Sequence, residues 1–137
     1  MKPSEQTQGI EAKVSAMEAR ARARMEESAA ALLQAEAYEA IARACRARAR
    51  ALRDVSAADL SLVNSGGEWD EVERARSDGQ RAREYAAIMD AEASRHESEA
   101  RRATAEAKRA EAEATSVRQR ARVLQTRELL DAHGQAG

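Results

Sequence analysis

The clearest chemical pattern is a row of basic side chains in the stretch "RACRARARALR". Arg43, Arg46, Arg50 and Arg53 follow at steps of three, four and three, which places them on one face of an α-helix. Guanidinium groups in such a row can pair with carboxylates or phosphates. Three interpretations stay open: a solvated row beside a packed seam, a docking patch for an acidic partner, and a nucleic-acid site.

The overall charge and the scarcity of aromatic residues argue against the nucleic-acid interpretation. The chain has 23 basic and 24 acidic residues, a net charge of −1, so no global field attracts phosphates. One Trp, two Tyr and no Phe leave few side chains on which bases could stack. We therefore expect protein partners and no nucleic acid.

Other side chains that could do chemistry are few. The string "HESEA" at His96 lacks the second histidine of the HExxH zinc motif. His96 is either a polar seam residue that helps to set the register, which we favour, or a ligand or switch. Cys45 is the single cysteine and is expected to pack in a seam. We predict no catalytic, cofactor-binding or metal-binding residue, and a protein that is not an enzyme.

One exposed anchor for a partner is suggested near the middle of the chain. Trp69 follows Asn64, Ser65, Gly66 and Gly67, the strongest turn signal in the sequence. It is interpreted either as a cap on the turn or as a partner anchor. With the four arginines, Trp69 completes the set of predicted partner-binding residues.

Two long series of mostly apolar residues, here called seams, must position these side chains. In each seam, successive members are on average about 3.5 residues apart, which is the coiled-coil period. The first seam consists of Ile10, Val14, Met17, Ala21, Met25, Ser28, Leu32, Ala35, Tyr38, Ala42, Cys45, Ala49 and Leu52. The second consists of Ala82, Ala86, Met89, Ala93, His96, Ala100, Ala103, Ala107, Ala110, Ala114, Val117, Ala121 and Leu124.

The seams predict an all-α fold in which two long helices form an antiparallel coiled-coil hairpin. We expect one helical-hairpin domain over residues 1–137, with a first arm over about 4–53 that begins at Ser4. A connector over about 54–80 contains the turn at 64–67. The second arm covers about 80–132, and residues 133–137 form a frayed tail. A reversal at Ser65 and Gly66 predicts that Cys45 faces Ala86 and Tyr38 faces Ala93.

Composition predicts a weak core and a soluble chain. Most apolar residues are alanine, which buries little area, so we expect a marginal monomer that self-associates or gains stability from a partner. No stretch reaches the ~18 consecutive apolar residues of a membrane span, and the N-terminus has no apolar signal segment. We expect a cytoplasmic protein without membrane insertion.

Two heptad arms around "NSGG", in a chain of this size, resemble the flagellar FliJ and type III secretion YscO stalk proteins. The resemblance spans the whole chain and concerns its architecture. It implies a stalk that contacts the export ATPase, the export gate or secretion chaperones. The alternative is a scaffold or stator coiled-coil subunit of another bacterial complex.

Overall fold

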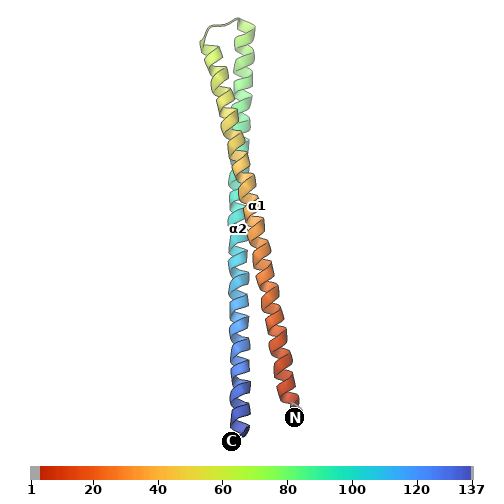
Figure 1. Ribbon diagram of the computed structural model, residues 1–137. Helices are drawn as coiled ribbons and strands as arrows, with labels where there is room; N and C mark the ends of the chain where they lie inside the picture. Colours follow the sequence, from red (N-terminus) through yellow and green to blue (C-terminus); the bar gives the residue numbers. More distant parts are fainter. Residues whose placement is uncertain (1–3, 137) are drawn as a thin grey trace. The chain divides into compact units, whose positions relative to one another are not determined.

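The computed structural model describes residues 4–136, which form two α-helices joined by a turn (Figure 1). Helix α1 covers Glu5–Asn64 and helix α2 covers Trp69–Ala136. No strand occurs in this part of the chain. The predicted all-α hairpin of two long helices packed against each other is confirmed.

Helix α1 begins where the sequence predicts. The backbone N–H of Thr7 donates a hydrogen bond of 3.2 Å to Oγ of Ser4, which satisfies one of the free donors of the first turn. Glu5 adds a carboxylate near the positive end of the helix dipole. Ser4 is therefore the N-cap residue.

The turn between the helices occupies residues 65–68. The backbone N–H and the hydroxyl of Ser65 both donate to the carbonyl oxygen of Leu62, at 3.2 and 2.8 Å, and so close the end of α1. Gly66 has a φ of 76°, a left-handed conformation that glycine adopts without a Cβ penalty. At the start of α2, the backbone N–H of Val72 donates to the carbonyl of Glu68 at 3.0 Å.

The predicted arm bounds, about 4–53 and 80–132, are corrected by the structure. The sequence left open whether residues 54–80 continue the helices or form separate short ones, and the structure answers that question. The helices continue through most of residues 54–80, because α1 ends at Asn64 and α2 begins at Trp69. The seam explains the continuation, since buried Ser56 and half-buried Val63 prolong it beyond Leu52. Residues 133–136, predicted to fray, belong to α2, and residue 137 lies outside the described residues.

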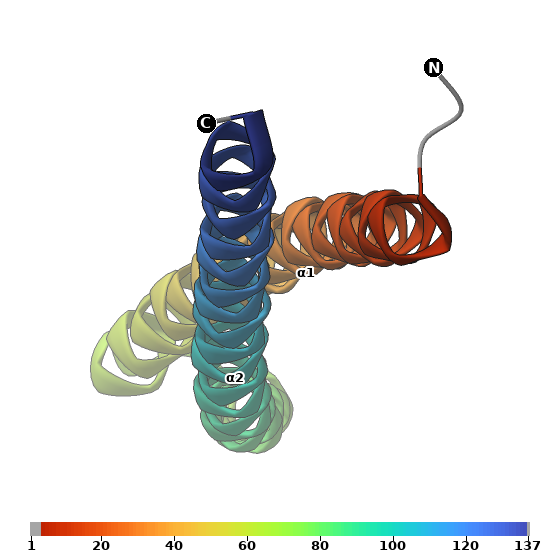
Figure 2. The same cartoon turned by 90° about the horizontal axis from the view of Figure 1, so that it is seen from below.

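Segments of α1 and α2 pack against each other in two units. The first unit combines residues 4–33 of α1 with residues 103–136 of α2. The second unit is residues 34–102 and holds the turn. Figure 2 shows it from below, coloured from orange-yellow to cyan.

Small residues at every seventh position form the core of both units. On α1 the buried series is Val14, Ala21, Ser28, Ala35, Ala42, Ala49 and Ser56. On α2 it is Gly79, Ala86, Ala93, Ala100, Ala107, Ala114 and Ala121. Short side chains at these positions let two helix backbones approach closely. The predicted second seam is confirmed, whereas Leu32 of the first is 47% exposed and is not a seam residue.

The register in the second unit follows from a close approach between Gly79 and Asp59. A Cβ atom placed on Gly79 would lie 3.2 Å from Cβ of Asp59, so these positions face each other. Two heptads further from the turn, the same register puts Cys45 opposite Ala93 and Ala49 opposite Met89. The predicted pairing of Cys45 with Ala86 is therefore wrong. The predicted pairing of Tyr38 with Ala93 is wrong as well, because the ring of Tyr38 stacks on His96.

The turn explains this shift. The prediction assumed that both arms end level with each other at Ser65 and Gly66. Instead, the non-helical residues 65–68 rise past the end of α1, and α2 begins above that end (Figure 1). Because the seam repeats every seven residues, the shifted register still places a small side chain opposite a larger one.

Candidate partner-binding surface

The four predicted arginines divide into two pairs in the second unit. Nε of Arg46 donates to Oε1 of Glu97 at 2.8 Å, and another nitrogen of Arg46 lies 3.6 Å from Oδ1 of Asp90. Arg53 forms an ion pair with the other oxygen of Asp90. Arg46 and Arg53 thus connect α1 to α2 along one edge of the seam.

Hydrogen bonding sets the electrostatics of this edge. The hydrogen bond from Arg46, together with its positive charge, lowers the pKa of Glu97, with burial acting in the opposite direction. The same bond raises the pKa of the Arg46 guanidinium, with smaller contributions from the charges of Glu97 and Asp90. Both groups are therefore held in their charged forms by each other.

Acid is expected to remove the contribution of Glu97 to stability. A carboxyl group with a lowered folded-state pKa stabilises the fold above its unfolded pKa, near 4.5, and this stabilisation is lost as the pH falls further. The difference in thermal midpoint between wild type and Glu97→Gln should be constant well above pH 4.5, shrink as the pH falls past that value, and vanish once the pH is below the lowered pKa of the folded state. Circular dichroism melts across this range measure the effect. Glu106→Gln, at an exposed position, is the control and should show no such loss.

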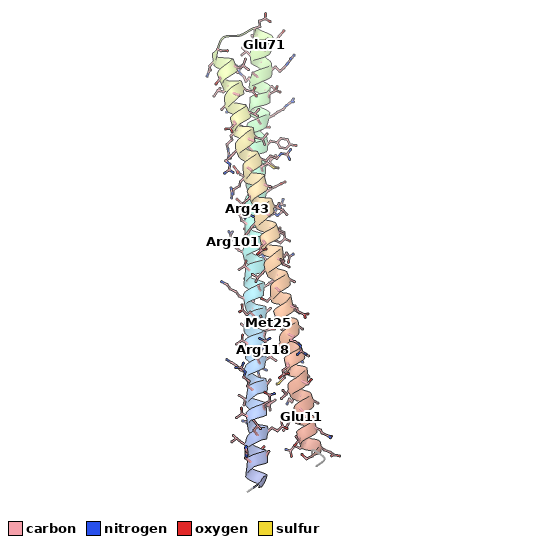
Figure 3. All side chains as sticks on the ribbon, in the orientation of Figure 1. Glu11, Met25, Arg43, Glu71, Arg101 and Arg118 are labelled. Carbon is pink, nitrogen blue, oxygen red and sulfur yellow. The ribbon has the colours of Figure 1, made fainter. Side chains whose placement is uncertain are left out.

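Arg43 and Arg50 remain outside this arrangement. Both side chains are exposed, and neither forms an ion pair with another residue of the described chain. Arg43 is labelled in Figure 3. These two guanidinium groups are the part of the predicted patch that stays available to a carboxylate of another molecule.

Charge reversal should separate the two pairs. Arg46→Glu with Arg53→Glu places four carboxylates along one edge of the seam, and we expect the thermal midpoint to fall by a few degrees. Arg43→Glu with Arg50→Glu changes the net charge equally and should leave the midpoint nearly unchanged. Thermal melts of both variants at low salt test this. Equal destabilisation by the two pairs would show that the inter-helix ion pairs have no structural role.

Trp69 does not cover the turn. It opens α2, and 75% of its surface is exposed. A capping side chain would be covered by the turn that it closes, so the interpretation as a cap is wrong. The interpretation as an exposed partner anchor stays a prediction.

Large apolar side chains lie on the surface, whereas alanines fill the core. Every residue in the core except Val14, Ser28, Ser56 and Gly79 is an alanine. The exposed large apolar residues are Leu32, Leu33, Ile41, Val55, Leu60, Leu62, Trp69, Tyr85, Ile88, Val123, Leu129 and Leu130, each at least 44% exposed. This distribution is the reverse of that in an ordinary globular domain.

His96 lies in the seam, as predicted. Its ring stacks on Tyr38 with centroids 6.0 Å apart and planes at 20°. Nδ1 of His96 is buried without a hydrogen-bond partner and lies 3.4 Å from Oε2 of Glu99, where protonation of the ring would complete an ion pair. Half-buried Cys45 lies one heptad from Tyr38 in the same seam.

Two features of the first unit were missed in the sequence. Arg24 occupies a seam position and pairs with Glu27 at 2.7 Å and with Glu113 of α2 at 2.8 Å, contacts that raise its pKa. A strict alternation of three and four from Ala21 would have placed Arg24, and not Met25, in the seam. The second feature is a groove lined by Arg22, Arg118 and Arg122. These residues are distant in the sequence, so only the pairing of the helices reveals it.

Residues 4–136 contain no group of three or more His, Cys, Asp or Glu side chains placed to hold a metal ion. No helix in the same residues has an apolar stretch long enough to cross a membrane. Comparison of the chain with models of protein families, with curated proteins and with solved structures finds no match.

Proposed function

We propose that this chain is a non-enzymatic coiled-coil protein that acts through contacts with protein partners. The observation that carries the proposal is the reversed placement of apolar side chains, with alanines inside and large residues outside. Exposed apolar side chains favour burial against another molecule. The exposed Trp69 and the unpaired Arg43 and Arg50 add an aromatic anchor and two charges of the kind that protein interfaces use.

Among interaction proteins, the architecture fits best a cytoplasmic stalk of a flagellar or type III secretion export apparatus, of the kind of FliJ and YscO. A helical hairpin with a short turn offers long helix faces and one compact end, which suits contact with a ring-shaped ATPase, an export gate or a chaperone. Exposed side chains extend along both helices, as the stick representation in Figure 3 illustrates. A scaffold or stator subunit of another bacterial complex is the alternative.

Binding to purified components of an export apparatus tests the proposal. The immobilised chain is mixed separately with the export ATPase, the cytoplasmic part of the export gate and the secretion chaperones of its own host. We expect saturable binding of at least one of them, weakened by Trp69→Ala. Binding of none, together with recovery of a different complex from host lysate, would favour the scaffold. Turnover of nucleotide or stoichiometric metal binding by the purified chain would contradict both.

The same proposal predicts that the isolated chain is marginally stable. An alanine seam buries little apolar area, so association with another molecule should add a large share of the stability. The thermal midpoint is expected to rise with protein concentration or on addition of the partner. A high midpoint that responds to neither would contradict the need for a partner.

A further inference from the structure

The first unit contains a groove whose lining carries more positive than negative side chains. Glu18 and Arg22 of α1 line one side, and Arg118, Ala121, Arg122 and Gln125 of α2 line the other, around a volume of about 330 Å³. The lining thus contains three guanidinium groups and one carboxylate. Arg118 is labelled in Figure 3.

These arginines differ from three others that lie beside the seam. Arg24, Arg46 and Arg53 each reach a carboxylate on the opposite helix. Arg22, Arg118 and Arg122 are exposed and make no ion pair with another described residue. Arg118 and Arg122 are one turn apart on α2, so their side chains lie side by side. Like charges gathered in this way repel each other, and a bound anion would relieve that repulsion.

Beyond the charged groove, α1 offers apolar contacts on the same side. Met25 and Leu32 follow Glu18 at intervals of one heptad, so the three share one edge of the helix. Met25 is half-buried and Leu32 is 47% exposed. The surface therefore continues from a basic groove to an apolar edge along the helix direction.

We propose that this surface binds an acidic amphipathic helix of a partner protein. Carboxylates spaced by three or four residues on that helix would accept hydrogen bonds from Arg22, Arg118 and Arg122, for which the planar guanidinium is well suited. Its apolar stripe would cover Met25 and Leu32. The inference names a surface for the interaction function proposed above and rests on it.

A nucleic acid fits this surface less well than a protein helix. Glu18 would repel a phosphate backbone. The aromatic side chains of the chain, Tyr38, Trp69 and Tyr85, all lie in residues 34–102 and not in this unit, so no stacking platform accompanies the groove. The apolar edge formed by Met25 and Leu32 has no counterpart in phosphate recognition.

The test uses the full chain and a labelled synthetic peptide of about four heptads, with an apolar stripe flanked by glutamates. Affinity is measured by fluorescence anisotropy for wild type, for Arg118→Gln with Arg122→Gln, and for Arg102→Gln with Arg109→Gln. The last pair is exposed on the opposite side of α2 and removes the same charge. Circular dichroism verifies that all three proteins are helical.

We expect the groove variant to bind roughly threefold to tenfold more weakly, the control variant to bind like wild type, and a glutamine version of the peptide to bind poorly. Leu32→Ser should weaken binding as well, without a change in charge. Equal losses in both arginine variants would overturn the inference in favour of diffuse attraction. Tighter binding of a short DNA, saturation by inorganic phosphate alone, or a chain that dimerises through this face and excludes the peptide would also overturn it.

These outcomes are independent of the test of the proposed function. If an export component binds the chain and the groove variant retains full affinity for it, the interaction function stands and the groove assignment fails. If no component binds but the peptide results hold, the groove is a genuine acidic-helix site and the stalk proposal fails.

Discussion

Ala49→Leu is expected to destabilise the hairpin by about 1 to 3 kcal/mol, because the seam at this position has no room for a larger side chain. Ala49 is fully buried, at 0% exposure, and the register places it opposite Met89. Three additional carbon atoms must push the helices apart or force Met89 from its rotamer. Urea unfolding followed by circular dichroism measures the loss.

The matched control for this prediction lies two residues away. Ala51 is exposed on the outer side of α1, so Ala51→Leu should change the free energy of unfolding by no more than about 0.5 kcal/mol. Both variants make the same chemical change in the same helix, which cancels differences in helix propensity. Equal effects of the two would mean that Ala49 does not face the second helix.

A disulfide between Cys45 and a cysteine at position 93 is expected to stabilise the hairpin by about 4 kcal/mol in the chain-entropy model, since it closes a long loop. Cys45 is the free thiol of the chain, and Ala93→Cys supplies its partner from the centre of the α2 seam. Facing seam positions come within the Cβ separation of about 3.5 to 4.5 Å that a disulfide requires. The comparison is the urea midpoint of the oxidised and reduced forms of the same variant.

Local signals in the sequence were sufficient to predict the fold class. The N-cap at Ser4, the glycines of the turn and the spacing of the second seam each correspond to what the structure shows. These signals act over at most a few turns of helix, where hydrogen bonding and burial depend on neighbours in sequence. The first seam could not be predicted as well, because the large apolar residues Met25 and Leu32 stand directly after the true seam residues. Those residues are Arg24 and half-buried Ala31.

The register of the hairpin could be predicted only to a multiple of one heptad. Any shift by seven residues returns small side chains to positions opposite large ones, so the seam alone does not distinguish Ala86 from Ala93 as the neighbour of Cys45. The geometry of residues 65–68 selects the register, and the near contact between Gly79 and Asp59 identifies it. Turn geometry of this kind depends on backbone dihedrals that the letters "NSGG" leave undetermined.

The register also decides which of the four arginines form ion pairs between the helices. Arg46 and Arg53 were predicted as one patch with Arg43 and Arg50 because all four share a helix face. The register brings Asp90 and Glu97 beside two of them and leaves the other two exposed. The groove of Arg22, Arg118 and Arg122 likewise exists only once residues distant in sequence are paired.

The measurement that tests the account most directly is a competition for Cys45 within one chain. A variant with both Ala86→Cys and Ala93→Cys is oxidised at low protein concentration, digested, and mapped by mass spectrometry. The hairpin and its register predict an intramolecular bond from Cys45 to position 93 as the main product. A bond mainly to position 86 would contradict the register, and crosslinks mainly between chains would contradict the hairpin itself.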